Sequence, residues 1–131
     1  MKVEIPVPIA DLFDKISILE IKKELILDDK KSSLIQHELE NLLEVLKKKE
    51  LINFLQSRLY NQLKDLNKEL WDLCDIRRDY EAQQIFDDSY IQKSRMEYKV
   101  NDRRAEIKNL INIELNSDFL EVKSYKKFSH Q

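Results

Sequence analysis

The sequence predicts an all-α protein, an antiparallel bundle of about four helices with one long central helix and a short extended N-terminal arm. Three observations predict this fold class. The 131 residues include no glycine, where average composition gives about nine. Pro6 and Pro8 are the only prolines, so nothing covalent interrupts a helix from residue 9 onward. Leu and Ile recur at steps of three and four residues, which is the spacing of one helical face.

The N-terminal part predicts an arm and a first helix. Residues 2–7 alternate polar and apolar side chains, and the prolines make this segment an edge strand or a strap. A helix follows over about 9–27, with Pro8 at a position that helix starts tolerate. Its apolar stripe consists of Ile9, Leu12, Phe13, Ile16, Leu19 and Leu27. Residues 28–33 predict a turn.

The middle of the chain predicts two further helices. Ser33 and Gln36 have the spacing of a capping box, which predicts a second helix from Ser33 to about residue 49. Leucines in near-heptad steps predict a third helix over about 52–80. At 1.5 Å per residue this helix would be about 45 Å long.

The C-terminal part predicts the fourth helix and a tail. Residues 83–88 form a polar break, after which Asp87 or Asp88 can cap a helix that runs to about Leu115. The tail covers about 117–131. No linker or repeat divides the sequence, so residues 1–131 form a single predicted domain.

Composition excludes several classes of function. Without glycine the chain cannot form a dinucleotide-binding fingerprint or a Walker loop. A net charge of −2 disfavours nucleic-acid binding, and no apolar run is long enough to span a membrane. The single cysteine, Cys74, cannot form an internal disulfide, which favours a cytoplasmic location. His37 and His130 have no ligand-spaced partner, so we expect no zinc site and no cofactor.

An acidic row on the third predicted helix is a weaker candidate site. Glu69, Asp72, Asp75 and Asp79 resemble the carboxylates that bind metals in helical pyrophosphohydrolases. On a helical wheel, however, Asp72, Asp75 and Asp79 lie opposite the leucine stripe. We therefore interpret the row as a solvated face.

Charged residues inside the apolar stripes are the strongest functional signal. Glu20 and Lys23 interrupt the first stripe, and Arg77 and Glu81 share a face of the third helix. On the fourth helix one face, bordered by Arg103, combines polar residues at steps of three, four and four: Asn101, Arg104, Lys108 and Asn112. Buried charges cost several kcal/mol each unless they are paired. These side chains therefore either pair with one another or bind a ligand.

Two interpretations of these charges stay open. In the first, Arg77, Arg104 and Lys108 donate to a carboxylate or phosphate in a pocket between the first, third and fourth helices. In the second, the same residues form structural ion pairs such as Glu20 with Arg77 or Glu81 with Arg104.

Three blocks of sequence carry a family resemblance: residues 14–22, residues 66–72 followed by Arg77, and residues 101–112 followed by 121–125. The chain resembles, over nearly its whole length, an uncharacterised bacterial family often encoded beside or fused to glycosyltransferases. The resemblance implies one helical domain with no established activity. Cys74 stands where the family pattern would place an acidic residue. The family's polar positions match Lys15, Glu20, Lys22, Asn67, Arg77, Asn101, Arg103, Arg104, Lys108 and Asn112.

Three functions follow as hypotheses. The leading one is a homo-oligomeric domain that binds an anionic small metabolite, such as a sugar phosphate, a nucleotide sugar or a carboxylate, through these ten residues. The second is an interaction module that docks on a glycosyltransferase or another partner, for which we expect an exposed apolar strip along the third helix. The third is a cofactor-free enzyme analogous to helical chorismate mutases, which act by positioning and electrostatics.

Overall fold

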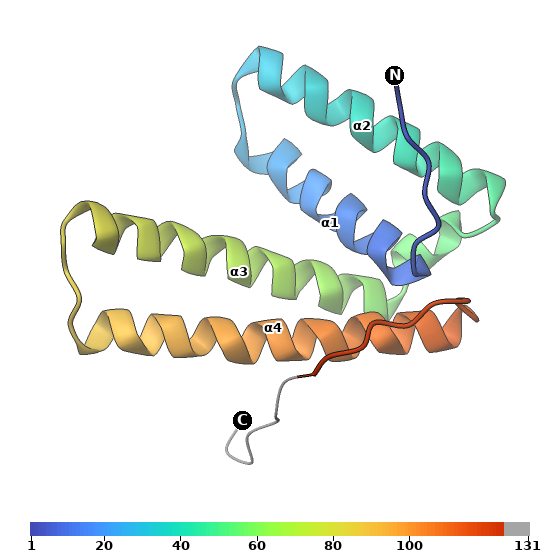
Figure 1. Cartoon of the computed structure of the whole chain (residues 1–131). Helices are drawn as coiled ribbons and strands as arrows, with labels where there is room; N and C mark the ends of the chain where they lie inside the picture. Colours follow the sequence, from blue (N-terminus) through green and yellow to red (C-terminus); the bar gives the residue numbers. More distant parts are fainter. Residues whose placement is uncertain (125–131) are drawn as a thin grey trace.

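The computed structural model describes residues 1–124 and contains four packed α-helices arranged as two hairpins (Figure 1). α1 (Ile9–Leu25) and α2 (Asp29–Lys48) form one hairpin, and α3 (Arg58–Ala82) and α4 (Asp88–Glu114) form the other. The 3-10 helix η1 (Ile52–Gln56) connects them. Since the described residues include no strand, the predicted all-α fold is confirmed.

Side-chain caps determine where three of the helices begin. Asp28, Ser57 and Asp87 each accept a hydrogen bond from the backbone N–H three residues later, at 2.9, 3.1 and 3.1 Å. The predicted cap at Asp87 is confirmed. The predicted capping box at Ser33 is wrong: because Asp28 caps the helix, α2 begins at Asp29 and Ser33 lies inside it.

Two predicted helix boundaries also differ from the structure. The third helix does not run unbroken from residue 52, because Ser57 is extended (φ −75°, ψ 156°) and caps α3. The preceding η1 segment instead turns Phe54 toward Phe13, with ring centroids 5.0 Å apart. The first helix ends at Leu25, so Leu27 is exposed rather than part of the apolar stripe. Residues 2–7 form an exposed extended arm without an assigned strand.

Three helices end in a left-handed residue that is not glycine. Glu50, Gln84 and Asn116 have φ of 58°, 56° and 59°. After each of them a backbone N–H donates back to a carbonyl in the last helical turn, for example Ile85 N to Tyr80 O at 2.9 Å. This pattern is the Schellman motif, in which the left-handed position usually carries glycine.

The hydrophobic core lies where α1 meets α3 and α4. The fully buried side chains there include Phe13, Ile16, Leu63 and Ile111. Leu46 of α2 is also fully buried and belongs to the same core. Figure 1 shows the α1–α2 hairpin crossing one half of the α3–α4 hairpin, while the other half extends past it. In this free half, between residues 74 and 99, no residue is buried. Across residues 1–124, no helix combines the length and apolar character that a membrane span requires.

Candidate functional site

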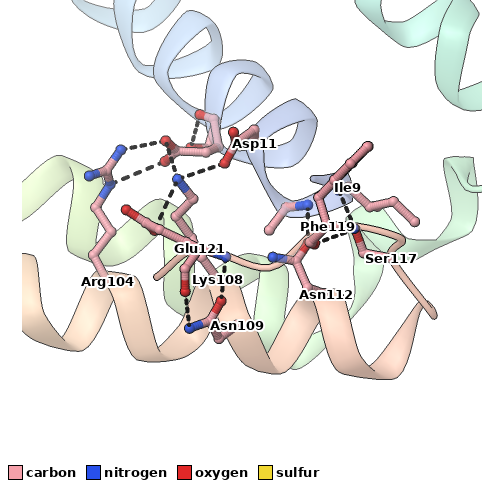
Figure 2. A network of polar contacts seen from close by, with 12 residues as sticks. Ile9, Asp11, Arg104, Lys108, Asn109, Asn112, Ser117, Phe119 and Glu121 are labelled. Carbon is pink, nitrogen blue, oxygen red and sulfur yellow. Dashed lines mark hydrogen bonds and ion pairs between the residues drawn. The ribbon is translucent and has the colours of Figure 1, made fainter. Parts of the chain in front are cut away.

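A buried carboxylate, Asp14, is the centre of a polar network between α1, α3 and α4, and Figure 2 shows the part of this network around Arg104, Lys108 and Glu121. It is only 7% exposed. The guanidinium of Arg104 donates to both carboxylate oxygens, with Nε 3.2 Å from Oδ1. The Asn67 amide donates at 2.7 Å to Asp14 Oδ1 and also at 2.7 Å to Ser17 Oγ. One carboxylate thereby joins three helices.

Lys108 extends the network from α4 to the first turn of α1. Its ammonium lies 2.9 Å from Asp11 Oδ1, 3.7 Å from Asp14 Oδ2 and 3.8 Å from Glu121 Oε2. Figure 2 shows the ammonium of Lys108 between the carboxylates of Asp11 and Glu121. Lys108 is 8% exposed, and a buried charge without such partners would be costly.

The segment after α4 returns along this helix and adds Glu121 to the network. The Asn109 amide pairs with the backbone N–H and C=O of Glu121, both at 3.3 Å. The bond from Lys123 lowers the pKa of Glu121, and the charges of Lys108 and Arg104 add to this effect. The network therefore contains as many cations as carboxylates, and its net charge is zero.

The first turn of α1 is capped by residues that lie more than 100 positions later in the chain. Pro8 provides no side-chain cap. Instead, Ala10 N donates to Asn112 Oδ1 at 2.8 Å and Ile9 N donates to Ser117 Oγ at 3.0 Å. These bonds satisfy backbone N–H groups that would otherwise be buried without partners. Asn112 is 1% exposed, and its Nδ2 has no hydrogen-bond partner among the described residues.

Arg77 belongs to a separate cluster in the free half of the α3–α4 hairpin. It pairs with Glu97 of α4, lies 3.5 Å from the hydroxyl of Tyr90 and lies 5.7 Å from the centroid of that ring. The bond to Tyr90 and then the bond to Glu97 raise the pKa of Arg77. Glu97 precedes Arg104 by seven residues, about 10 Å along the helix. Arg77 therefore does not converge with Arg104 and Lys108.

The α1 residues that were predicted to bind a ligand contact side chains outside the Asp14 network. Glu20 accepts a hydrogen bond from Tyr60 and lies 3.5 Å from Lys64. Burial first, and then Glu20, raise the pKa of Tyr60 above its usual range. Lys15 is exposed and pairs with Glu38 of α2 at 2.8 Å, and Lys22 is half-buried on α1.

The specific ion pairs Glu20–Arg77 and Glu81–Arg104, which the helical wheel suggested, are wrong. Arg77 pairs with Glu97 and Arg104 pairs with Asp14, while Glu81 is exposed. Asn101 and Arg103 are exposed as well. Arg104 is the first residue of α4 with a described polar contact to α1, whereas Arg77 and Glu97 pair in the half of the hairpin that extends past the α1–α2 hairpin.

The family model of DUF6165, a family of unknown function, matches residues 1–129. The chain belongs to this family. No curated protein and no solved structure matches the chain. The candidate site of this DUF6165 domain is therefore defined by the contacts between its own residues.

The sequence alone did not point to the carboxylates of the DUF6165 network. Asp11 and Asp14 lie outside the predicted apolar stripe of α1, yet α1 packs against α2 on one side and against α3 and α4 on another. The signal lay in Ala10 and Ser17, two small residues seven apart that flank Asp14 and are fully buried. Small residues at helical spacing allow a second helix to approach closely.

A surface groove of about 430 Å³ lies between η1 and the end of α4. None of the ten predicted binding residues lines it. Its lining contains two carboxylates and no basic side chain: Glu50, Leu51, Asn53, Phe54, Gln56, Ser57, Glu114 and Leu115. A groove of this composition does not favour an anion.

The acidic row of the third predicted helix lies on the surface of α3. Glu69, Asp72, Asp75 and Asp79 are all exposed, and residues 1–124 contain no metal-binding cluster of His, Cys, Asp and Glu. The solvated-face interpretation of the acidic row agrees with this exposure. The part of the predicted tail that follows Ser124 lies outside the described residues.

Proposed function

We propose that this protein is a non-catalytic interaction module, a helical scaffold that presents the free half of the α3–α4 hairpin to a protein partner. One observation carries the proposal: the charges between α1 and α4 neutralise one another. Arg104 and Lys108 already bind Asp11, Asp14 and Glu121. An anionic ligand would have to displace one of these carboxylates and leave it unpaired, which is costly for a buried charge.

The free half of the hairpin supports a docking role. It contains no buried residue, yet it carries large apolar side chains. Phe86 is 52% exposed, Ile91 49% and Tyr98 73%. Exposed apolar groups that gather on one element are typical of interaction surfaces. These exposed apolar groups lie on α4 and on the loop that precedes it. They do not lie along α3, where the interaction-module hypothesis predicts an exposed apolar strip.

An anion-binding domain is the second candidate, and Asn112 favours it. The Nδ2 of Asn112 is a buried donor without a partner in the described part of the chain, and Asn112 lies one helical turn after Lys108. Such a donor is suited to a carboxylate or phosphate oxygen. A chorismate-mutase-like enzyme would use the same groups. A glycosyltransferase as partner and a cytoplasmic location remain predictions.

A thermal-shift screen separates the module from the anion-binding domain. The wild type and an Arg104→Met variant are melted with a panel of sugar phosphates, nucleotide sugars and dicarboxylates. The module predicts no stabilisation by any of them. Stabilisation of the wild type but not of Arg104→Met by one compound would overturn the module and support the ligand site.

The same variants test whether the network is structural. Arg104→Met leaves Asp14 buried without its main partner, which we expect to cost about 3 kcal/mol of unfolding free energy. Asp14→Asn/Arg104→Met removes both charges and should recover most of this loss. Urea unfolding measures both values. A single variant as stable as the wild type would show that Arg104 is kept for binding and not for folding.

A further inference from the structure

The face of the α3–α4 hairpin turned away from α1 carries a basic row on α4. Arg95, Lys99 and Arg103 are exposed and four residues apart, so they lie on one side of the helix. Lys99 precedes Lys108 by nine residues, about 180° around the helix at 100° per residue. Since Lys108 faces α1, the basic row faces away from it.

An acidic row lies on α3 and is also turned from α1. Glu69, Asp72 and Asp79 are exposed. Asn67 is the α3 residue that bonds Asp14 and Ser17 of α1. Asp72 follows Asn67 by five residues, about 140° around the helix, and therefore points well away from α1.

Within residues 1–124, Asp72 is the one member of the two rows that has a described ion pair. Asp72 pairs with Lys68 on its own helix at 2.7 Å. Arg95, Lys99 and Arg103 form no ion pair with any residue from 1 to 124. Two exposed rows of opposite charge on one face form a surface that is complementary to a copy of itself.

Residues of the two rows also lie at similar positions along the axis of the α3–α4 hairpin. Tyr80 of α3 lies beside Ser89, with their oxygens 2.8 Å apart, and Arg77 pairs with Glu97. Because α3 and α4 are antiparallel, residues earlier in α3 lie beside residues later in α4. From these neighbouring pairs, Asp72 lies about level with Lys99 and Glu69 about level with Arg103. Asp72 and Glu69 thus each have a residue of the basic row at about the same height on the neighbouring helix, whereas Asp79 has none.

We infer that this face is the interface of a homodimer whose two-fold axis runs parallel to the hairpin helices. This rotation places α3 of each copy over α4 of its partner in antiparallel orientation and at the same height. The acidic row of each copy then meets the basic row of the other, so both contacts form at once, as an isologous interface requires. The inference rests on the proposed function, because it names a second copy as the protein partner. It extends the interaction surface from the free half to the outer face of the covered half, where Glu69, Arg103 and Leu110 are exposed.

Apolar side chains on the same face add contact area. Leu110 is 49% exposed and Met96 39%. On the wheel, Leu110 lies within about 20° and Met96 within about 60° of Lys99. Surface ion pairs alone contribute little to affinity, so these groups stabilise the dimer while the charged rows determine its register.

Charge reversal tests the interface with a complementary pair of variants. Lys99→Glu/Arg103→Glu reverses the two basic residues that face the acidic row, and Glu69→Lys/Asp72→Lys reverses the two acidic residues that face the basic row. Analytical ultracentrifugation should show a dimer for the wild type in low salt and a monomer for each variant alone. An equimolar mixture of the two variants should form a heterodimer, because both contacts are restored. The wild-type dimer should weaken at about 1 M salt, where the Debye length falls to about 3 Å.

A matched control changes the same charge elsewhere. Lys30→Glu/Lys31→Glu alters two exposed lysines of α2 and should leave the dimer unchanged. Circular dichroism checks that every variant is folded. A wild type that is monomeric at all concentrations, or variants that dimerise alone as the wild type does, would overturn the inference. The metabolite screen does not depend on dimerisation, so failure here is distinguishable from failure of the proposed function.

Discussion

Asp14 shows how one residue determines the role of its neighbours. Arg104 and Lys108 have the side chains of an anion site, and on a helical wheel alone they look like one. In the folded chain their partners are Asp14, Asp11 and Glu121. A buried charge requires a counter-charge, and within residues 1–124 these carboxylates provide it for Arg104 and Lys108.

Glu121 gives a prediction at the residue scale. Its pKa is lowered in the folded protein, chiefly by Lys123. A carboxylate with a lowered folded pKa stabilises the fold above its unfolded pKa, near 4.5, and this contribution is lost as the pH falls through the folded value. Glu121→Gln should therefore be less stable than the wild type at pH 7. The difference should shrink as the pH falls below 4.5.

Urea unfolding of both proteins between pH 3 and pH 7 measures this difference. Glu114→Gln is a suitable control, because Glu114 is exposed and lies outside the network. A gap between wild type and Glu121→Gln that stays constant with pH would mean that the charge of Glu121 does not stabilise the fold.

The sequence patterns predicted some helix ends correctly and missed others. The cap at Asp87 followed from its position before an apolar series, and the structure confirms it. The break at Ser57 was not predicted, because the leucine spacing continues across it. The Ser57 cap and the packing of Phe54 on Phe13 accompany the break in the structure. Periodicity identifies a helical face, whereas caps depend on local backbone geometry.

The left-handed caps give a prediction at the element scale. Gln84 has φ 56°, a conformation that costs a residue with a Cβ about 1 kcal/mol and costs glycine almost nothing. Gln84→Gly should therefore stabilise the protein by about 0.5–1 kcal/mol and raise the Tm by about 3 °C. Calorimetry measures the shift.

Gln83→Gly is the matched control for this prediction. Gln83 is the adjacent residue and has φ −89°, so glycine there adds only conformational entropy to the unfolded chain. It should lower the Tm. If both variants changed the Tm in the same direction, strain at Gln84 would not be the cause.

The whole molecule is uneven in stability because its two hairpins overlap along only half of their length. All buried residues of α3 and α4 lie outside 74–99. The network around Asp14 connects α1 only to the half of the α3–α4 hairpin that α1 covers. Local opening is easiest where few apolar side chains are buried. The half that we propose as an interaction surface is therefore also the half that opens most readily.

Hydrogen exchange tests this uneven stability. In the monomeric variant Lys99→Glu/Arg103→Glu, amides of residues 74–82 and 88–99 should exchange faster than those of 60–73 and 100–112. The second group packs against α1, whereas the first does not. Mass spectrometry of peptic fragments resolves the two groups. Equal protection along both helices would contradict the expected difference.

The sequence by itself determined the helical fold class, because a chain without glycine and with prolines only before residue 9 allows helices almost everywhere. It also identified Arg104, Lys108 and Asn112 as polar residues in a core-facing position, since helical periodicity fixes the face of each residue. Only the tertiary structure decided their partners. The crossing of α1 over α4 brings Asp14 to Arg104 and Ala10 to Asn112, and no local pattern encodes that crossing.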